Sequence, residues 1–373
     1  MILRIEDLKE TCSAILPAVD SNELSSLTET LALEVVNKVL YLSVTNREYF
    51  VKVQLPIGEE VDFKATVNAN LFLKLVSQTT TDTIELSVSN SNLVLKGNGT
   101  YKLPLIYDND KLLELPEITI NNVTASFDIP GSTLNSILTQ NTKQLSIGTI
   151  SKLVQKMYYM DEKGALTFTS GACINNFTLP KPLKVLFNQR LVKLFKLLKD
   201  STVKFSLGHD ALTDDIIQTK VRFETPTITI TSILSCDDTM LNTVPVDAIR
   251  QRANNVYPYS ASINKQSLMD SINRMRLFVT TTKSITSYAK FSMSKSQMVI
   301  SDLSGENKEV IYYNNDIDAM QEDTYSMYLD LVDLSAVLDT CFEANVQLNF
   351  GDNQAITISR GNIINVIPEV RLD

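Results

Sequence analysis

The sequence lacks features on which many catalytic sites depend. Among 373 residues there is no Trp and a single His, and Gly and Pro number 11 each. No GxxxxGK[ST] or GxGxxG segment occurs, so no phosphate-binding glycine loop is indicated. His209 follows Gly208 in a segment that reads as a surface turn. A Ser-His-Asp or Cys-His catalytic site is therefore not expected.

Long hydrophobic runs and closely spaced cysteines are also missing. The first ten residues contain no apolar segment typical of a signal peptide, and no run of about 18 apolar residues occurs. Cys12, Cys173, Cys236 and Cys341 are too far apart for a metal-ligand motif or a disulfide framework. We expect buried, reduced thiols in a cytoplasmic protein that has no membrane span, metal or cofactor.

Clustered acidic residues are the remaining candidates for a catalytic or metal site. Asp210, Asp214 and Asp215 could hold a hard cation, but they lack the ligand spacing of a calcium loop. A solvated hairpin tip is the simpler interpretation, and it also fits Asp316 and Asp318. A hydrolase built on carboxylates has no positive support, so we do not expect an enzyme.

A leucine recurs at the start of six amphipathic segments. The positions are Leu8, Leu71, Leu134, Leu191, Leu268 and Leu331. The spacings are 63, 63, 57, 77 and 63 residues. Self-similarity at a nearly fixed period indicates one supersecondary unit that is built repeatedly. Function is then expected to belong to the assembled array rather than to one catalytic pocket.

Each copy of the repeat reads as a strand, a helix and two further strands. Alternating apolar residues such as Phe63, Ala65 and Val67 predict a half-buried strand before the helix. The helix of the fourth copy carries apolar residues at i, i+3, i+4 and i+7, which form one stripe. The stripe consists of Leu191, Leu194, Phe195 and Leu198. After the helices, pairs of β-rich runs separated by turn residues predict hairpins, as in 83–95 and 346–358.

Helices on one face of antiparallel sheets predict an α+β fold. Charged or Pro-containing connectors occur at Tyr107–Asn121 and Thr243–Tyr257. They divide the chain into three tandem similar domains of two repeats each, at 1–120, 121–252 and 253–373.

Cationic side chains gather on several of the predicted helices, although the chain has a net charge of −9. On the fourth helix they lie opposite the apolar stripe. The candidates are Lys74, Lys143, Lys152, Lys156, Arg190, Lys193, Lys196, Lys199, Arg274 and Arg276. An ordinary solvated face is one interpretation. The other is loose, sequence-independent contact with DNA phosphates. The first and sixth helices are acidic, so such contact is expected on the second to fifth helices.

The chain resembles the bacterial-type sliding clamps, which are the processivity rings of replicative DNA polymerases. The resemblance covers essentially the whole length and rests on the sixfold repeat and three segments. These are Thr167–Ile174, Met240–Pro245 and Asn365–Leu372. It implies the DNA clamp fold, with two three-domain chains that close head-to-tail into a ring around double-stranded DNA.

The resemblance also implies a pocket that binds short hydrophobic peptides of DNA polymerase, clamp loader and repair factors. The corresponding residues are Val154, Thr169, Gly171, Ala172, Cys173, Ile174, Leu241, Val244, Pro245, Val366, Ile367, Pro368 and Val370. Ordinary core and strand-end positions are the alternative interpretation. Ala172 and Cys173 stand where the family has His-Arg, and Glu369 adds an acid to the tail. The peptide preference is therefore expected to differ.

The homodimer interface implied by the resemblance would use Tyr101 of one copy and Leu277 and Phe278 of the other. Core positions within a domain are the alternative. A clamp would need a separate loader ATPase, because this chain has no nucleotide motif. The competing hypothesis is a structural β-rich viral assembly protein with duplicated domains. It would explain the repeats, but not the basic fourth helix or the hydrophobic tail.

Overall fold

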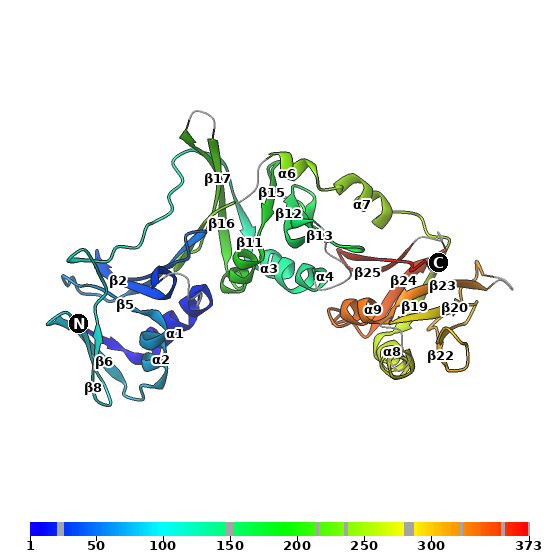
Figure 1. The fold of residues 1–373 in the computed structure, drawn as a ribbon, viewed down its shortest axis with the longest axis horizontal. Helices are drawn as coiled ribbons and strands as arrows, with labels where there is room; N and C mark the ends of the chain where they lie inside the picture. Colours follow the sequence, from blue (N-terminus) through cyan, green and yellow to red (C-terminus); the bar gives the residue numbers. More distant parts are fainter. Residues whose placement is uncertain are drawn as a thin grey trace. The chain divides into compact units, whose positions relative to one another are not determined.

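The chain folds into two compact units in the computed structural model (Figure 1). Unit 1 consists of Met1–Asn135 and Arg190–Ser235, and unit 2 of Ser136–Gln189 and Cys236–Asp373. Both combine helices with antiparallel sheets, which confirms the α+β prediction. The structure describes residues 1–20, 26–145, 152–213, 216–234, 238–279, 287–320, 324–351 and 355–371. Cys236, Asp214, Asp215 and Leu372 lie outside these residues.

Unit 1 contains an eight-stranded and a four-stranded antiparallel sheet. The larger runs in the order β11 (Val123–Pro130), β16 (Thr202–Thr213), β17 (Ile216–Glu224), β18 (Ile228–Ile233), β4 (Tyr49–Pro56), β3 (Val39–Thr45), β2 (Thr30–Val36) and β5 (Lys64–Asn68). The smaller runs β1 (Ile2–Arg4), β6 (Thr83–Ser89), β7 (Asn92–Lys96) and β8 (Thr100–Pro104). A short hairpin joins β9 (Tyr107–Asp108) to β10 (Lys111–Leu112).

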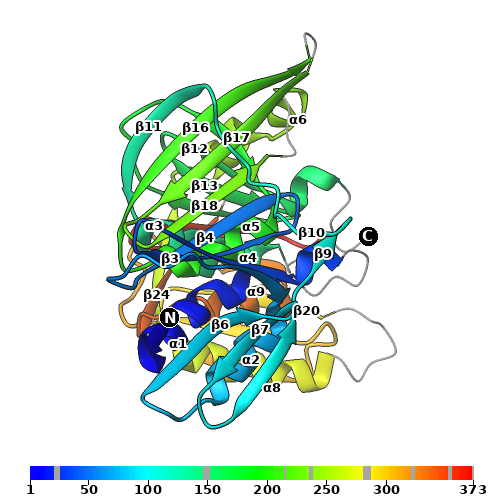
Figure 2. The ribbon, with the colours of Figure 1, turned by 90° about the vertical axis from the view of Figure 1, so that its left-hand side faces the viewer.

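The helices of unit 1 pack their apolar faces against these sheets. They are α1 (Ile5–Ile15), α2 (Ala69–Gln78), α3 (Gly131–Ser136, which ends at the unit boundary) and α5 (Gln189–Lys193, continued by a 3-10 turn at Leu194–Leu198). Helices α1 and α2 pack side by side (Figure 2).

Unit 2 repeats this arrangement. Its eight-stranded sheet runs β15 (Lys184–Phe187), β12 (Tyr158–Asp161), β13 (Gly164–Phe168), β14 (Ala172–Asn176), β26 (Ile363–Pro368), β25 (Ala355–Arg360), β24 (Asn345–Phe350) and β19 (Tyr259–Asn264). Its four-stranded sheet runs β22 (Lys308–Tyr312), β21 (Gln297–Ser301), β20 (Tyr288–Met293) and β23 (Tyr325–Asp330). The helices are α4 (Thr142–Gln144), α6 (Asp238–Asn242), α7 (Val246–Ala253), α8 (Lys265–Val279) and α9 (Leu331–Leu338).

The two eight-stranded sheets have the same construction. Each is made of two four-stranded halves that meet at one antiparallel pair, β4 with β18 in unit 1 and β14 with β26 in unit 2. We call these pairs the junctions. Each four-stranded sheet has the strand order of one such half. The strand that would form the junction, β8 or β22, has no partner strand among the described residues.

Along the described parts of the chain, six copies of a strand-helix-strand-strand-strand unit follow one another. The predicted repeat is therefore correct, but each copy has one strand more than the sequence indicated. The additional strands are difficult to recognise because they alternate poorly. In β8, for example, Leu103 is buried while Thr100 to Lys102 and Pro104 are exposed.

Five of the six repeated leucines are buried, and Leu71 is the exception, with 52% of its surface exposed. Helix α2 begins at Ala69, capped by the Asn68 side chain, which accepts from the Leu71 amide. The buried face is then Ala69, Phe72, Leu73 and Val76. The recurring leucine is therefore not a buried position in the second copy, because the cap sets where the helix starts.

Two interpretations of polar residues in the β16–β17 hairpin are corrected. His209 lies within β16 rather than in a turn, and its Nδ1 is 3.2 Å from the Thr219 hydroxyl. Asp210 is buried rather than solvated, and Lys220 donates to it at 2.8 Å. The hairpin is longer than expected, so these residues lie inside the sheet rather than at its tip.

Candidate functional site

A pocket of about 340 Å³ opens beside the junction of unit 2. Its floor comes from the β13–β14 turn and the end of β26, and its wall from helix α7 and the residue before it. The lining residues are Phe168, Thr169, Ser170, Gly171, Ala172, Pro245, Ala248, Ile249, Arg252, Val366 and Pro368. The lining is mainly apolar, and Arg252 is its one charged member.

Gly171 allows the β13–β14 turn to lie against β26. The Thr169 amide donates to the Gly171 carbonyl at 2.8 Å, which closes the turn. A Cβ atom at Gly171 would lie 2.5 Å from the Val366 carbonyl oxygen, which is closer than packing allows. The Gln144 side chain donates to the Thr169 hydroxyl at 3.1 Å and fixes the other side of the turn. A side chain at residue 171 would therefore push the pocket floor away from β26.

The pocket rests on an apolar cluster that includes Val154, Leu166, Ile174 and Val244. Ala172 faces Val366 across the junction pair. Because successive residues of a strand point to opposite faces, Ala172 and Ile174 share the side of β14 that carries this cluster. The pocket floor is therefore formed by packed strand residues rather than by loops alone.

Six predicted pocket residues line the pocket: Thr169, Gly171, Ala172, Pro245, Val366 and Pro368. Val154, Ile174, Leu241 and Val244 belong to the apolar cluster against which it is built. The structure does not place Cys173, Ile367 or Val370 in the lining.

Strand alternation explains two of these corrections. Cys173 is fully buried on the other side of β14, and its thiol donates to the Gln140 carbonyl at 3.7 Å. Burial raises the pKa of this thiol to about 12. Ile367 likewise points into the second hydrophobic core of unit 2. The Val370 amide donates to the Tyr328 carbonyl at 2.8 Å, which ties the tail to β23.

The sequence interpretation missed Phe168, Ser170, Ala248, Ile249 and Arg252. Three of these belong to α7, a helix inside the segment that had been interpreted as a connector. Val246, Ile249 and Ala253 recur at i, i+3 and i+7, which is the signal that could have revealed it.

The cations of the fourth helix form one exposed row. Arg190, Lys193, Lys196 and Lys199 are all exposed, while Leu194 and its apolar neighbours are buried. Part of this helix is 3-10, and side chains three residues apart eclipse one another in that geometry. The step of three in the sequence therefore keeps Lys193, Lys196 and Lys199, which span the 3-10 turn, on one side of the helix.

Several of the predicted DNA-facing residues, Arg190 among them, are placed less favourably. Arg190 lies 3.3 Å from Glu48, and Arg274 makes a bidentate ion pair with Glu309 at 2.7 and 2.8 Å. These carboxylates neutralise much of the charge that a phosphate would meet. Arg276 is half-buried, and Lys143, Lys152 and Lys156 are exposed in unit 2. Lys74 lines a groove between α1 and α2 together with Lys9, which sequence reasoning did not select.

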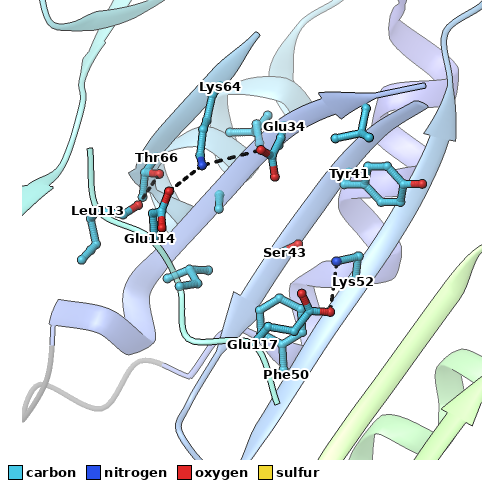
Figure 3. A pocket seen from close by; sticks show the side chains of 14 residues that line it. Glu34, Tyr41, Ser43, Phe50, Lys52, Lys64, Thr66, Leu113, Glu114 and Glu117 are labelled. Carbon is cyan, nitrogen blue, oxygen red and sulfur yellow. Dashed lines mark hydrogen bonds and ion pairs between the residues drawn. The ribbon is translucent and has the colours of Figure 1, made fainter. Parts of the chain in front are cut away.

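A second pocket, of about 400 Å³, lies in unit 1 beneath the segment that follows β10 (Figure 3). Its opening is crossed by ion pairs. Lys64 contacts Glu34 at 3.6 Å and Glu114 at 2.8 Å, and Lys52 contacts Glu117 at 3.2 Å. The hydrogen bond with Lys64 holds the pKa of Glu114 below its ordinary value. Each charged group drawn in this pocket therefore already has an ion-pair partner.

The predicted interface residues lie on or near β8 and β22, which are edge strands of the two four-stranded sheets. Tyr101 on β8 is 40% exposed, and Leu277 and Phe278 at the end of α8 are 66% and 46% exposed. Helix α8 packs against β22, where Tyr312 is 70% exposed. Large apolar side chains thus accompany both of these edge strands.

In the described parts of the chain, helices are too short or too polar to cross a membrane. Nor do three or more His, Cys, Asp or Glu side chains converge there in a way that could hold a metal ion.

Comparison with known proteins gives a result only at the level of three-dimensional structure. No family model and no curated protein matches the sequence. A sliding clamp from Pseudomonas aeruginosa, solved with griselimycin bound, matches with a TM-score of 0.78 at 15% identity. The DNA polymerase III beta subunit of Thermotoga maritima gives 0.76 at 13%, and the sliding clamp of Bacillus subtilis gives 0.75 at 16%. Each alignment covers 100% of this chain and 99% of the other. The chain therefore has the fold of the bacterial DNA sliding clamps over its whole length.

Proposed function

We propose that this protein is a divergent DNA sliding clamp, a homodimeric ring that encloses duplex DNA and tethers a polymerase. The observation that carries the proposal is the full-length likeness to bacterial clamps despite identities of 13–16%. The rival hypothesis of a viral assembly protein is not favoured by this likeness. The three-domain division at 1–120, 121–252 and 253–373 belongs to the proposal.

The half-sheets support ring closure. Within each unit, two halves join at a junction, and the halves ending at β8 and β22 lack a partner among the described residues. Pairing β8 of one copy with β22 of a second would build another eight-stranded sheet of the same strand order. Two such pairings would close a head-to-tail dimer and remove both exposed edges. Tyr101, Leu277 and Phe278 would then be covered.

The pocket beside the β14–β26 junction supports peptide tethering. Its apolar lining and single cation suit a short hydrophobic peptide from a polymerase or a clamp loader. A tethered polymerase has a raised effective concentration at the primer end, so processivity increases without catalysis. A separate loader would supply the ATPase activity.

The exposed row of Lys193, Lys196 and Lys199 supports weak phosphate contact. Such contacts carry no sequence information, and each one contributes a salt-dependent term to affinity. Replacing Lys193 and Lys196 by Ala should weaken binding to a short duplex and flatten its dependence on salt. Lys181→Ala, an exposed lysine that belongs to unit 2 and not to this row, is the control. An unchanged salt dependence would argue against this surface.

The ring itself is tested by negative-stain imaging and solution mass on one purified sample. We expect a closed ring of two chains with a central hole. Retention on a nicked circular plasmid, lost when the plasmid is linearised, would add the topological link. A solid particle, a monomer or a large shell would overturn the proposal.

A further inference from the structure

Helix α7 has little within itself to hold it in place. It has eight residues, and isolated helices of this length are unstable in water. Pro245 precedes it and supplies no capping side chain. Of its residues, Ala253 is buried, while Ala248 and Arg252 are exposed at the pocket. Contacts with the rest of unit 2 must therefore hold this wall of the pocket.

Besides the packing of Val246, Ile249 and Ala253 on the apolar cluster, α7 makes a largely buried ion pair on its side away from the pocket. Arg250 donates to Asp161 through both terminal nitrogens, with distances of 2.7 Å from Nη1 to Oδ2 and 2.6 Å from Nη2 to Oδ1. Asp161 ends strand β12 and is 4% exposed. At about 100° per residue, Arg250 lies about 200° around the helix from both Ala248 and Arg252.

Other groups keep the Asp161 carboxylate in place. The Lys163 amide donates to Oδ1 at 2.9 Å, and the Tyr159 hydroxyl donates to Oδ2 at 3.3 Å. Burial opposes ionisation of Asp161, but the hydrogen bonds from Arg250 and Lys163 outweigh it, so its pKa lies below the ordinary value. The carboxylate is thus charged and fixed on the sheet, ready to receive a guanidinium.

We infer that Asp161 is a positioning residue for peptide binding, acting through Arg250 to hold α7 at the pocket. The inference rests on the proposed function of the pocket. Arg250 matches the carboxylate with two parallel hydrogen bonds, a geometry that Lys cannot reproduce. When the pair is broken, the back of α7 loses its anchor while every pocket-lining side chain is retained.

The test uses the full chain and two independent measurements. The first is hydrogen exchange of residues 246–253 by mass spectrometry, which needs no peptide. The second is titration with a fluorescein-labelled hexapeptide, chosen as the tightest binder from a panel that pairs Leu and Phe residues with varied polar positions. The variants are Asp161→Asn, Arg250→Gln, Arg250→Lys and the double variant Asp161→Asn/Arg250→Gln. Asp302→Asn, in the β21–β22 turn of the same unit, is the matched control.

We expect Asp161→Asn to speed exchange in α7 and to weaken the hexapeptide at least about tenfold, the equivalent of 1.4 kcal/mol. For Arg250→Lys, both the exchange rate in α7 and the hexapeptide affinity should lie between those of wild type and Asp161→Asn. The double variant should lose less binding free energy for the hexapeptide than Asp161→Asn and Arg250→Gln lose together, because the two residues act as one pair. Asp302→Asn should leave both measurements unchanged.

The outcomes separate this inference from the proposed function. Unchanged exchange in α7 of Asp161→Asn would overturn the anchoring role, whatever the peptide does. Faster exchange with unchanged affinity would overturn the positioning role. A wild-type chain that binds no member of the panel would overturn the proposed pocket, and with it the link to binding. The circular dichroism spectrum of each variant confirms that it is folded.

Discussion

Two connectors cross sheets of the same construction in this molecule. The surface beneath the first connector is charged, and the surface beside the second is mainly apolar. The first, residues 105–122, passes over the eight-stranded sheet of unit 1, and the second, residues 238–258, passes over that of unit 2. The first is attached by Lys–Glu pairs along its underside (Figure 3). The second is attached from behind, through Arg250, and turns an apolar face to the pocket.

This difference indicates what makes a junction into a binding site. Beneath the first connector, three carboxylates and two ammonium groups are joined in ion pairs, so a ligand would have to break existing pairs. Beneath the second, the lining is apolar apart from Arg252, and a hydrophobic side chain can enter without displacing a charge. The two sheets have the same construction, so in the proposed clamp the connector would decide which of them can bind a peptide.

The largest expected effect comes from the floor of the second pocket. Gly171→Ala should abolish measurable hexapeptide binding, because its Cβ would meet the Val366 carbonyl at 2.5 Å. Forced repacking of this kind costs about 1–3 kcal/mol of stability, so the unfolding temperature should fall as well. Titration and thermal unfolding of the same sample provide the check. Wild-type affinity would show that the turn can move without affecting the site.

A second effect tests the junction that the proposed ring forms between copies. Phe278→Ala should weaken dimerisation at least about tenfold, because it removes a large exposed apolar side chain beside the β22 edge. Sedimentation at low micromolar concentration would then show monomer. An unchanged mass would mean that Phe278 serves its own domain rather than an interface.

A smaller effect is expected when the first connector is released. In Glu114→Gln/Glu117→Gln, hexapeptide affinity should stay within about twofold of wild type, because exposed ion pairs contribute little and the pocket lies elsewhere. Hydrogen exchange in residues 113–117 should nevertheless rise. A marked loss of peptide affinity would contradict the separate roles of the two connectors.

The smallest effect is that of pH. Asp161 and Glu114 both have lowered pKa values, so the stability they contribute is complete above their unfolded pKa values, about 3.9 for Asp and 4.3 for Glu. That stability is lost only as pH falls through the lower folded pKa values. Hexapeptide affinity should therefore be flat from pH 5 to 8 with respect to these groups. A titration midpoint inside that window would require another group.

Much of the architecture could be predicted because it depends on local periodicity. The apolar stripes at Leu191 and Leu334, and the hairpin of β6 and β7, follow from spacing alone. The hairpin turn places Asn90 and Ser91 at positive φ, a conformation that suits Asn. Strands such as β8 were missed because few of their side chains face a core.

The site was predicted only in part, because it depends on tertiary placement. Strand alternation places Cys173 behind the pocket although Ala172 lines it, and a resemblance that assigns a block of residues cannot distinguish the two. Helix α7, which forms the pocket wall, lies in a charged segment whose composition is typical of a linker. Asp161 and Arg250 are 89 residues apart, so no local pattern indicates that they meet.

The repeated half-sheet also has a mechanical consequence. At both junctions within the chain, a covalent connector crosses the seam between the halves. In the proposed dimer, the seam between β8 and β22 would join separate chains, so no such tether could cross it. Each subunit of the ring would then have two junctions that are crossed by the covalent chain. The third, between β8 and β22 of different copies, would be held by non-covalent contacts alone. In that proposed ring the last seam would be the gate, since it could part and reclose while the rest of the ring kept its shape.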